Sequence, residues 1–179
     1  MPKRMVGVIS NLDRLIRTTE YYRKHAELDA LTGMYNRHGF WHRLTGLLDT
    51  SSRETFTLLF ADMDNLKSIN DQWGHLAGDQ ALLQLAQTFR HLFPEMVLSA
   101  RWGGDEFLLL LPGALEEDTL RARLTPLLNS DTSQLSCSPG AAILAPGTGV
   151  EQAIHQADMA LYQAKQHKPA LYISRNQTT

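Results

Sequence analysis

Two adjacent carboxylates, Asp105 and Glu106, follow a pair of glycines and are the residues in this chain best suited to chemistry. Apolar residues flank this stretch on both sides, which predicts a β-hairpin with Gly103 and Gly104 at its tip, where glycine reaches positive φ without steric cost. Successive strand residues point to opposite faces of a sheet. One carboxylate can therefore hold a metal ion while the other takes a proton. A solvated, charged turn without chemistry is the alternative.

Asp62 and Asp64 form a second pair of carboxylates, at the end of the apolar run 56–61. The run predicts a buried strand, and a helix is expected to follow over 65–73. Acidic residues between a buried strand and a helix are well placed to meet a ligand. This junction is therefore a second candidate for chemistry.

The elements that must position these carboxylates follow from the spacing of the apolar residues. After a turn at 74–79, Asp79 is expected to cap a helix that ends at Pro94. Further helices and strands are expected at 36–48, 116–128, 135–144, 150–165 and 170–173. Pro139 interrupts a strand, which predicts an edge strand or a bulge because proline donates no ladder hydrogen bond. The order predicts an α/β (α+β) fold with a mostly antiparallel sheet covered by helices.

The N-terminal residues 5–28 predict a helix, because apolar residues recur at spacings of four and three. They are Met5, Ile9, Leu12 and Ile16, followed by Thr19. The helix either lies on its own domain or forms a short coiled coil that pairs two chains. The chain is accordingly divided into an N-terminal helix at 1–28, a candidate coiled-coil linker, and a single domain at 29–179.

The composition is that of a globular protein, with 43% apolar and 20% charged residues among 179. A net charge of −2 gives no reason to expect a nucleic-acid polymer or a membrane surface as partner. The single cysteine, Cys137, excludes an intramolecular disulfide and suits the cytoplasm. We find no membrane-spanning run and no signal peptide in the sequence. A membrane tether would have to come from outside this chain.

Four patterns stand in order along the chain: Asp29-x-Leu31-Thr32-Gly33-x-x-Asn36-Arg37, Asp62-x-Asp64-x-x-Lys67-x-x-Asn70-Asp71-x-x-Gly74-His75-x-x-Gly78-Asp79, Arg101-x-Gly103-Gly104-Asp105-Glu106-Phe107 and Ala157-Asp158-x-Ala160-Leu161-Tyr162-x-Ala164-Lys165. In order and spacing they resemble the GGDEF domain of diguanylate cyclases, and the resemblance extends over 29–176. The resemblance implies the palm-like fold of nucleotide cyclases and polymerases, with the signature on a hairpin. The implied reaction joins two GTP molecules into cyclic di-GMP at the interface of a homodimer and releases two pyrophosphates.

The resemblance also implies a role for individual residues. Asp62, Asp105 and the Met63 carbonyl would bind Mg²⁺ or Mn²⁺, and Glu106 would assist deprotonation of the attacking hydroxyl or add to metal binding. The substrate-binding residues implied are Gly103 and Gly104 beside the nucleotide, Lys67 and Lys165 at the phosphates, and Asn70 and Asp79 as guanine readers. Taken singly, Lys67 is typical of a solvated helix lysine, Asn70 of a helix end and Asp79 of an N-cap.

Other motif residues are interpreted as structural. Asp29, Asn36 and Arg37 are expected to brace the entry into the domain. Asp64 is expected to serve the local fold, and His75 is expected to lie in the turn before Gly78.

The chain departs from the family pattern at three places. The family often places a phosphate-holding arginine four residues after its late lysine, where this chain has Pro169 and, one position earlier, Lys168. The family's inhibitory product site uses Arg-x-x-Asp, and the corresponding residues here are Pro94 and Val97. No product inhibition through that site is therefore expected. Pro139 stands where an aliphatic strand residue is usual.

Three hypotheses follow from these observations. The first is an active diguanylate cyclase. The second is a catalytically impaired GGDEF domain that binds GTP or cyclic di-GMP as a regulatory module, which Pro169 favours. The third is a cyclase for another nucleotide such as ATP, which Asn70 and Asp79 oppose, because adenine offers no donor pair to a carboxylate.

Overall fold

The computed structural model describes residues 27–50, 53–128, 135–167 and 171–174. Most of the N-terminal helix expected at 5–28 lies outside these residues, as do Lys168 and Pro169. The elements are β1 (Tyr35–Asn36), α2 (Arg37–Thr50), β2 (Phe56–Met63), α3 (Leu66–Trp73), α4 (His75–Leu92), β3 (Leu98–Arg101), β4 (Glu106–Pro112), α5 (Glu117–Leu128), β5 (Cys137–Leu144), α6 (Val150–Gln166) and β6 (Tyr172–Ser174). Within the described ranges, no helix is both long and apolar enough to cross a bilayer.

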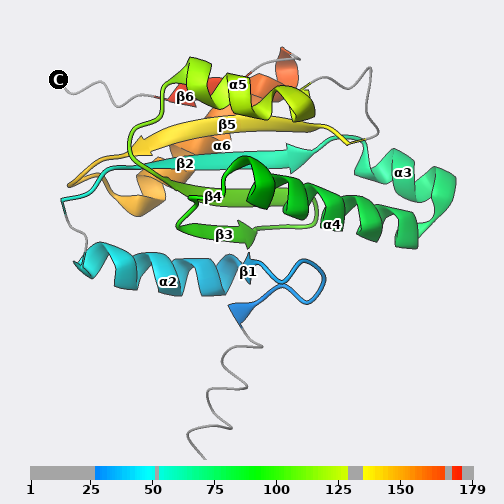
Figure 1. Cartoon of the computed structure of the whole chain (residues 1–179), viewed down its shortest axis with the longest axis horizontal. Helices are drawn as coiled ribbons and strands as arrows, with labels where there is room; N and C mark the ends of the chain where they lie inside the picture. The colour runs from blue at the N-terminus through cyan, green and yellow to red at the C-terminus, as the bar shows by residue number, and fades with distance from the viewer. Residues whose placement is uncertain (1–26, 51–52, 129–134, 168–170, 175–179) are drawn as a thin grey trace, which may run out of the picture.

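One six-stranded sheet, in the order β1-β3-β4-β2-β5-β6, runs through the middle of the molecule (Figure 1). β2 pairs antiparallel with both β4 and β5, and β3 and β4 form the expected hairpin. The pairings of β1 with β3 and of β5 with β6 are parallel. The expected mostly antiparallel sheet flanked by helices is therefore confirmed.

The two faces of the sheet carry separate apolar cores. Leu59 and Ala61 of β2 pack with α4 and α5 on one face, whereas Leu58 and Phe60 pack with α2 and α6 on the other. In Figure 1, α4 and α5 lie in front of the sheet and α6 lies behind it. The alternation follows from the two-residue repeat of strand side chains. Asp62 continues the series of Leu58 and Phe60, so its carboxylate projects on the α2 and α6 face.

β2 is two residues longer than the sequence predicts, since it extends through Asp62 to Met63. Asp62 thus lies inside a strand instead of after it. Its direct neighbours in the register are Glu106 on β4 and Ser138 on β5. Side chains directly opposite each other in an antiparallel pair share a face. The sheet therefore brings the carboxylates of Asp62 and Glu106 to the same face.

The expectation of an edge strand or a bulge at Pro139 is wrong. β5 lies between β2 and β6, and its register against β2 runs from Phe56–Leu144 to Met63–Cys137 without a skipped residue. The register with β6 begins at Gly140, so no β6 residue stands opposite Pro139. The proline is tolerated because it lies beyond the end of the short neighbouring strand.

The turn expected at 74–79 and the cap expected at Asp79 are also wrong. Only Gly74, at φ 84°, separates α3 from α4, and α4 already begins at His75. Glycine adopts positive φ without a Cβ clash, so one residue is enough to redirect the chain. Asp79 therefore stands on the second turn of α4, where its carboxylate is exposed.

Gly140 allows α6 to lie directly on β5. A Cβ at Gly140 would stand 1.9 Å from the backbone nitrogen of Leu161, which cannot move without the helix. The contact fixes the height of α6 above the sheet. Lys165, one turn after Leu161, is positioned by the same contact.

Gly140→Ala is expected to destabilise the protein by about 2 kcal/mol or more, because added volume in a packed core costs roughly 1–3 kcal/mol and the obstacle here is backbone. Gly46→Ala in α2 is the matched control. A Cβ there would have no neighbour within 4 Å among the described residues, so replacing this helical glycine should stabilise by roughly 0.5–1 kcal/mol. Urea unfolding midpoints measure both changes. Equal midpoints for the two variants would show that the approach of α6 is not tight.

Candidate functional site

Asp62 and Lys165 form the centre of the candidate site. Lys165 Nζ lies 2.8 Å from Asp62 Oδ2, and the Asp62 residue is only 7% exposed. Burial raises the pKa of Asp62, Lys165 lowers it, and the charges of Asp105 and Asp64 raise it further, so that the net direction is upward. A buried carboxylate held among like charges gains from any added cation. Lys165 supplies one positive charge from α6.

Glu106 shares this crowded electrostatic environment. Burial raises the pKa of Glu106, as do the charges of Asp62, Asp105 and Asp158, while Lys165 opposes them. The carboxyl group therefore holds a proton more readily than an ordinary glutamate does. Such a shift suits a residue that accepts a proton during a reaction.

The donor set suits a divalent cation such as Mg²⁺, which prefers hard oxygen ligands. Neighbouring carboxylates raise the pKa of Asp62 and the pKa of Glu106, and a bound cation would relieve this repulsion. Among the described residues, no group of three or more Asp, Glu, His or Cys side chains is arranged to hold a metal ion. A cation here would therefore need ligands besides side chains, such as the Met63 carbonyl, waters or phosphate oxygens.

The signature turn is tied to β2 and to its own strand through backbone contacts. Met63 N donates to the Asp105 carbonyl at 2.9 Å, and Trp102 N donates to the Glu106 carbonyl at 2.7 Å. Asp105 precedes β4, which begins at Glu106, so these two carboxylates are not neighbours on one strand. The turn is consequently held on both sides of its tip.

The expectation that Gly103 and Gly104 reach positive φ is wrong, because neither is among the glycines with positive φ. Position 103 needs glycine for a different reason: a Cβ there would stand 2.6 Å from Glu106 Oε2 and clash with that carboxylate. Nothing in the described structure lies within 4 Å of a Cβ at Gly104. The tip at Gly104 is thus open to the surroundings.

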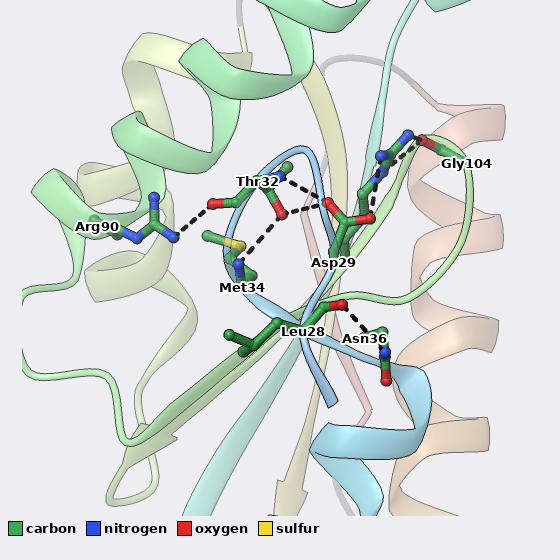
Figure 2. A network of polar contacts seen from close by, with 8 residues as sticks. Leu28, Asp29, Thr32, Met34, Asn36, Arg90 and Gly104 are labelled. Atoms are coloured by element: carbon green, nitrogen blue, oxygen red, sulfur yellow. Dashed lines mark hydrogen bonds and ion pairs between the residues drawn. The ribbon is translucent and has the colours of Figure 1, made fainter. Parts of the chain in front are cut away.

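A bridge of polar contacts joins the entry turn of the domain to the signature turn (Figure 2). The Arg101 guanidinium donates to the Gly104 carbonyl from Nη2 at 2.6 Å and from Nε at 3.1 Å. Its Nη1 lies 3.3 Å from Asp29 Oδ2. A guanidinium has five donors in a fixed plane and can make these contacts together, which a lysine cannot. Asp29 therefore positions the signature turn through Arg101.

Asp29 also organises its own turn. Its Oδ1 accepts hydrogen bonds from Thr32 N at 2.8 Å and Thr32 Oγ1 at 2.7 Å, and Gly33 completes the turn with φ 66°. Arg90 of α4 donates to the Thr32 carbonyl at 3.0 Å (Figure 2). Asn36 Oδ1 accepts from Gly39 N at 2.9 Å and caps α2. Asp29 and Asn36 thus brace the entry into the domain, as the sequence predicts.

The two predicted guanine readers and the first phosphate contact lie on the α3–α4 pair. A Cβ at Gly78 would stand 2.0 Å from Asn70 Oδ1, so Asn70 reaches α4 right beside Asp79. Lys67 and Asp79 are exposed. The structure therefore brings Asn70 and Asp79 together, while Lys67 lies one turn before Asn70 on α3.

Two buried groups have a structural part in the site. Ser138 Oγ donates to Asp64 Oδ1 at 2.9 Å, and Asp64 N donates to the Ser136 carbonyl at 2.9 Å. Asp64 is only 8% exposed. It ties the end of β2 to β5, in agreement with the expected role in the local fold.

Asp158 is a site residue that sequence reasoning left without a role. It stands seven residues before Lys165 on α6 and lines a cavity together with Glu106. Seven residues are two helical turns, so both side chains lie on one side of α6. That spacing was visible in the sequence. What the sequence did not show is that this side of α6 lies over the carboxylates.

The six-stranded sheet with its carboxylate-bearing hairpin has the palm-like fold of nucleotide cyclases. A family model described as "Diguanylate cyclase, GGDEF domain" matches residues 26–170. The chain therefore belongs to the GGDEF diguanylate cyclase family.

Individual relatives agree with this family. The chain is 30% identical over 171 residues to the diguanylate cyclase DgcM of Escherichia coli, covering 91% of this chain and 42% of DgcM. It is 40% identical over 153 residues to the diguanylate cyclase TpbB of Pseudomonas aeruginosa, covering 78% of this chain and 35% of TpbB. The chain thus spans less than half the length of both relatives.

A solved structure of similar shape is the coiled coil and GGDEF domain of DgcB from Caulobacter crescentus, in complex with c-di-GMP. It has a TM-score of 0.80 and 26% identity to this chain, with 96% of this chain and 97% of that one covered.

The Asp29 bridge predicts a specific loss of stability in acid. Burial raises the pKa of Asp29, but the hydrogen bonds from Thr32 and the contact with Arg101 bring it below the ordinary value of 3.8. A depressed pKa in the folded state stabilises the protein above the unfolded pKa, and this stabilisation disappears as the pH falls through the folded pKa. Asp29→Asn should therefore destabilise at pH 7 and much less at pH 3. Urea midpoints at both pH values, with exposed Asp49→Asn as control, measure the difference. An equal loss at both pH values would contradict the role of the Asp29 charge.

Proposed function

We propose that this domain is an active diguanylate cyclase, which condenses two GTP molecules into cyclic di-GMP and releases two pyrophosphates. The observation that carries the proposal is the placement of Asp62 and Glu106 side by side on neighbouring strands, with Lys165 2.8 Å from Asp62. Phosphoryl transfer needs such groups: carboxylates that bind a metal ion or accept a proton, and an ammonium group that binds phosphate.

Asp62, Asp105 and the Met63 carbonyl would hold the divalent cation, Mg²⁺ or Mn²⁺. When bound, that ion neutralises charge on the phosphate oxygens and orients them for displacement. Lys165, whose Nζ lies 2.8 Å from Asp62 Oδ2, would contribute its ammonium to phosphate binding. Lys67, from the first turn of α3, adds a second positive charge beside the helix N-terminus.

Glu106 would accept the proton of the attacking ribose 3′-hydroxyl. The crowding that raises its pKa makes it a better base at neutral pH than an ordinary glutamate. Gly103 leaves room for its carboxylate, and Gly104 leaves the tip open to the nucleotide. The 3′-oxygen then bonds to the α-phosphorus, and pyrophosphate leaves with the electron pair of the broken bond.

Asn70 and Asp79 would read guanine. The carboxylate of Asp79 accepts hydrogen bonds from the N1–H and the N2 amino group, and the amide of Asn70 serves the remaining polar edge. Adenine lacks the donor pair and would leave the carboxylate unpaired. GTP is thereby favoured over ATP.

Product formation would require two chains, because one chain presents one set of carboxylates and one pair of guanine readers. Two such halves facing each other form both phosphodiester bonds of the cyclic product. The domain would work in the cytoplasm, where GTP is supplied. Since Pro94 and Val97 replace an arginine and an aspartate, we expect no feedback by product at that place.

The proposed activity is tested by incubating the purified chain with GTP and Mg²⁺ at several protein concentrations and detecting cyclic di-GMP by chromatography. Product should form at a rate per chain that rises with concentration, and chelation of the metal should abolish it. Glu106→Gln should lower kcat by roughly 100-fold or more. Glu54→Gln, an exposed change just before β2, is the control.

GTP binding without product at any concentration would replace the proposal with the catalytically impaired binding module. Unchanged turnover in Glu106→Gln would refute the role of Glu106 alone.

Guanine recognition by Asp79 predicts a change of nucleotide preference. Asp79→Asn should weaken GTP binding by roughly tenfold or more, because a hydrogen-bonded carboxylate is lost. ATP binding should change little, so the GTP-to-ATP affinity ratio falls. Calorimetric titration with both nucleotides measures it, with the exposed Asp118→Asn on α5 as control. An unchanged ratio would exclude Asp79 as the reader.

A further inference from the structure

The cavity that Glu106 and Asp158 line lies between α2 and α6, on the face of the sheet that these two helices cover. Its volume is about 320 Å³. Trp41 of α2 and Ile154 of α6 form its sides, and Phe60 of β2 and Trp102 before the signature glycines contribute to its lining. The cavity is thus a continuation of the candidate site away from the α3–α4 pair.

Its aromatic lining is rigid. The Trp102 ring packs against Phe40 and Phe60 edge to face, with centroids 5.9 and 6.0 Å apart, and tilts against Trp41 at 6.2 Å. The Arg37 guanidinium lies 4.8 Å from the centre of the Trp102 ring. Rings held in this way form a preformed apolar surface, as ligand sites usually do.

Two carboxylates at the cavity lack partners in the described structure. Neither Glu151 nor Asp158 forms an ion pair or hydrogen bond with the residues described, and both are exposed at the cavity. Asp158 lies near enough to Glu106 for its charge to raise the pKa of Glu106. The Asp158 carboxylate is therefore available to accept a hydrogen bond from a ligand, beside Glu106, the proposed proton acceptor.

The charge of the cavity selects which part of a nucleotide can enter. Its lining includes three carboxylates, from Glu106, Glu151 and Asp158, and one guanidinium, from Arg37. This excess of negative charge repels a triphosphate. It does not repel a nucleoside, which is neutral and whose ribose offers two hydroxyl donors.

Resting on the proposed function, we propose that this cavity holds the ribose of the attacking GTP and that Asp158 accepts a hydrogen bond from its 2′-hydroxyl. The 3′-hydroxyl must lie beside Glu106 to lose its proton there. The 2′-hydroxyl is its neighbour on the same ring, so it falls next to the adjacent carboxylate of the same cavity. Trp41 and Trp102 would then pack against the apolar carbon atoms of the ribose.

The proposal predicts that the enzyme distinguishes GTP from 2′-deoxy-GTP, which keeps the attacking 3′-hydroxyl. Wild-type kcat/KM should be roughly tenfold or more higher for GTP, since a hydrogen bond to a charged group is lost with the deoxy substrate. Asp158→Ala should reduce the ratio to near one, and Asp158→Asn should lie between. Asp118→Ala, an exposed acidic change on α5 outside the cavity, is the matched control and should keep the wild-type ratio.

A binding measurement makes the test independent of turnover. In a Trp73→Phe background the remaining tryptophans, Trp41 and Trp102, both line the cavity. Guanosine should quench their fluorescence at several-fold lower concentration than 2′-deoxyguanosine, and Asp158→Ala should remove this difference while circular dichroism shows an unchanged fold.

These outcomes distinguish a failure of the cyclase activity from a failure of the ribose site. Absence of product from GTP, together with the ribose preference in fluorescence, would refute the cyclase and leave the ribose site in place. Equal quenching by both nucleosides, no quenching by either, or a turnover ratio unchanged in Asp158→Ala would each overturn the ribose site.

Discussion

The burial of the Asp62 carboxylate among like charges is the constraint on which the rest of the site depends. Without compensation, a buried charge near Asp105 and Glu106 would take up a proton. Lys165 compensates it from α6, and α6 can do so only because Gly140 admits the helix backbone onto β5. The charge state of Asp62, at the end of β2, is therefore linked to the packing of α6 on β5, which lies on the opposite side of β2 from the β3–β4 hairpin.

The signature turn is held by two independent systems. Backbone hydrogen bonds join it to β2 through Met63, and the Arg101 guanidinium joins its Gly104 carbonyl to Asp29 at the entry of the domain. The second system connects the start of the domain to the signature turn through the Arg101 side chain. Glu27, directly before this entry, is itself held by Arg43 of α2 at 3.0 Å. A displacement of the chain before Asp29 would thus be transmitted through Arg101 to the signature turn.

The two sides of the site differ in charge and in rigidity. The α3–α4 pair, joined through Gly74 alone, presents a half-buried Asn70 and an exposed Asp79. The cavity between α2 and α6 is instead lined by interlocked rings and carries excess negative charge. The charge of the cavity therefore disfavours phosphate groups there, whereas Lys67 of α3 and Lys165 of α6 supply positive charge outside it.

The sequence by itself determined the hairpin, the helices α5 and α6 and their buried faces, and the types of residues at the site, because these follow from local spacing and residue chemistry. It also indicated the bracing role of Asp29, although not its partner, since Arg101 lies 72 residues away. The tertiary structure alone decided that Asp62 is a strand residue opposite Glu106 and that Asp79 lies within α4. It also decided that Pro139 sits in an interior strand and that Asp158 faces the cavity. These features depend on strand register and helix placement, which arise from contacts between distant segments and leave no periodic signal in the chain.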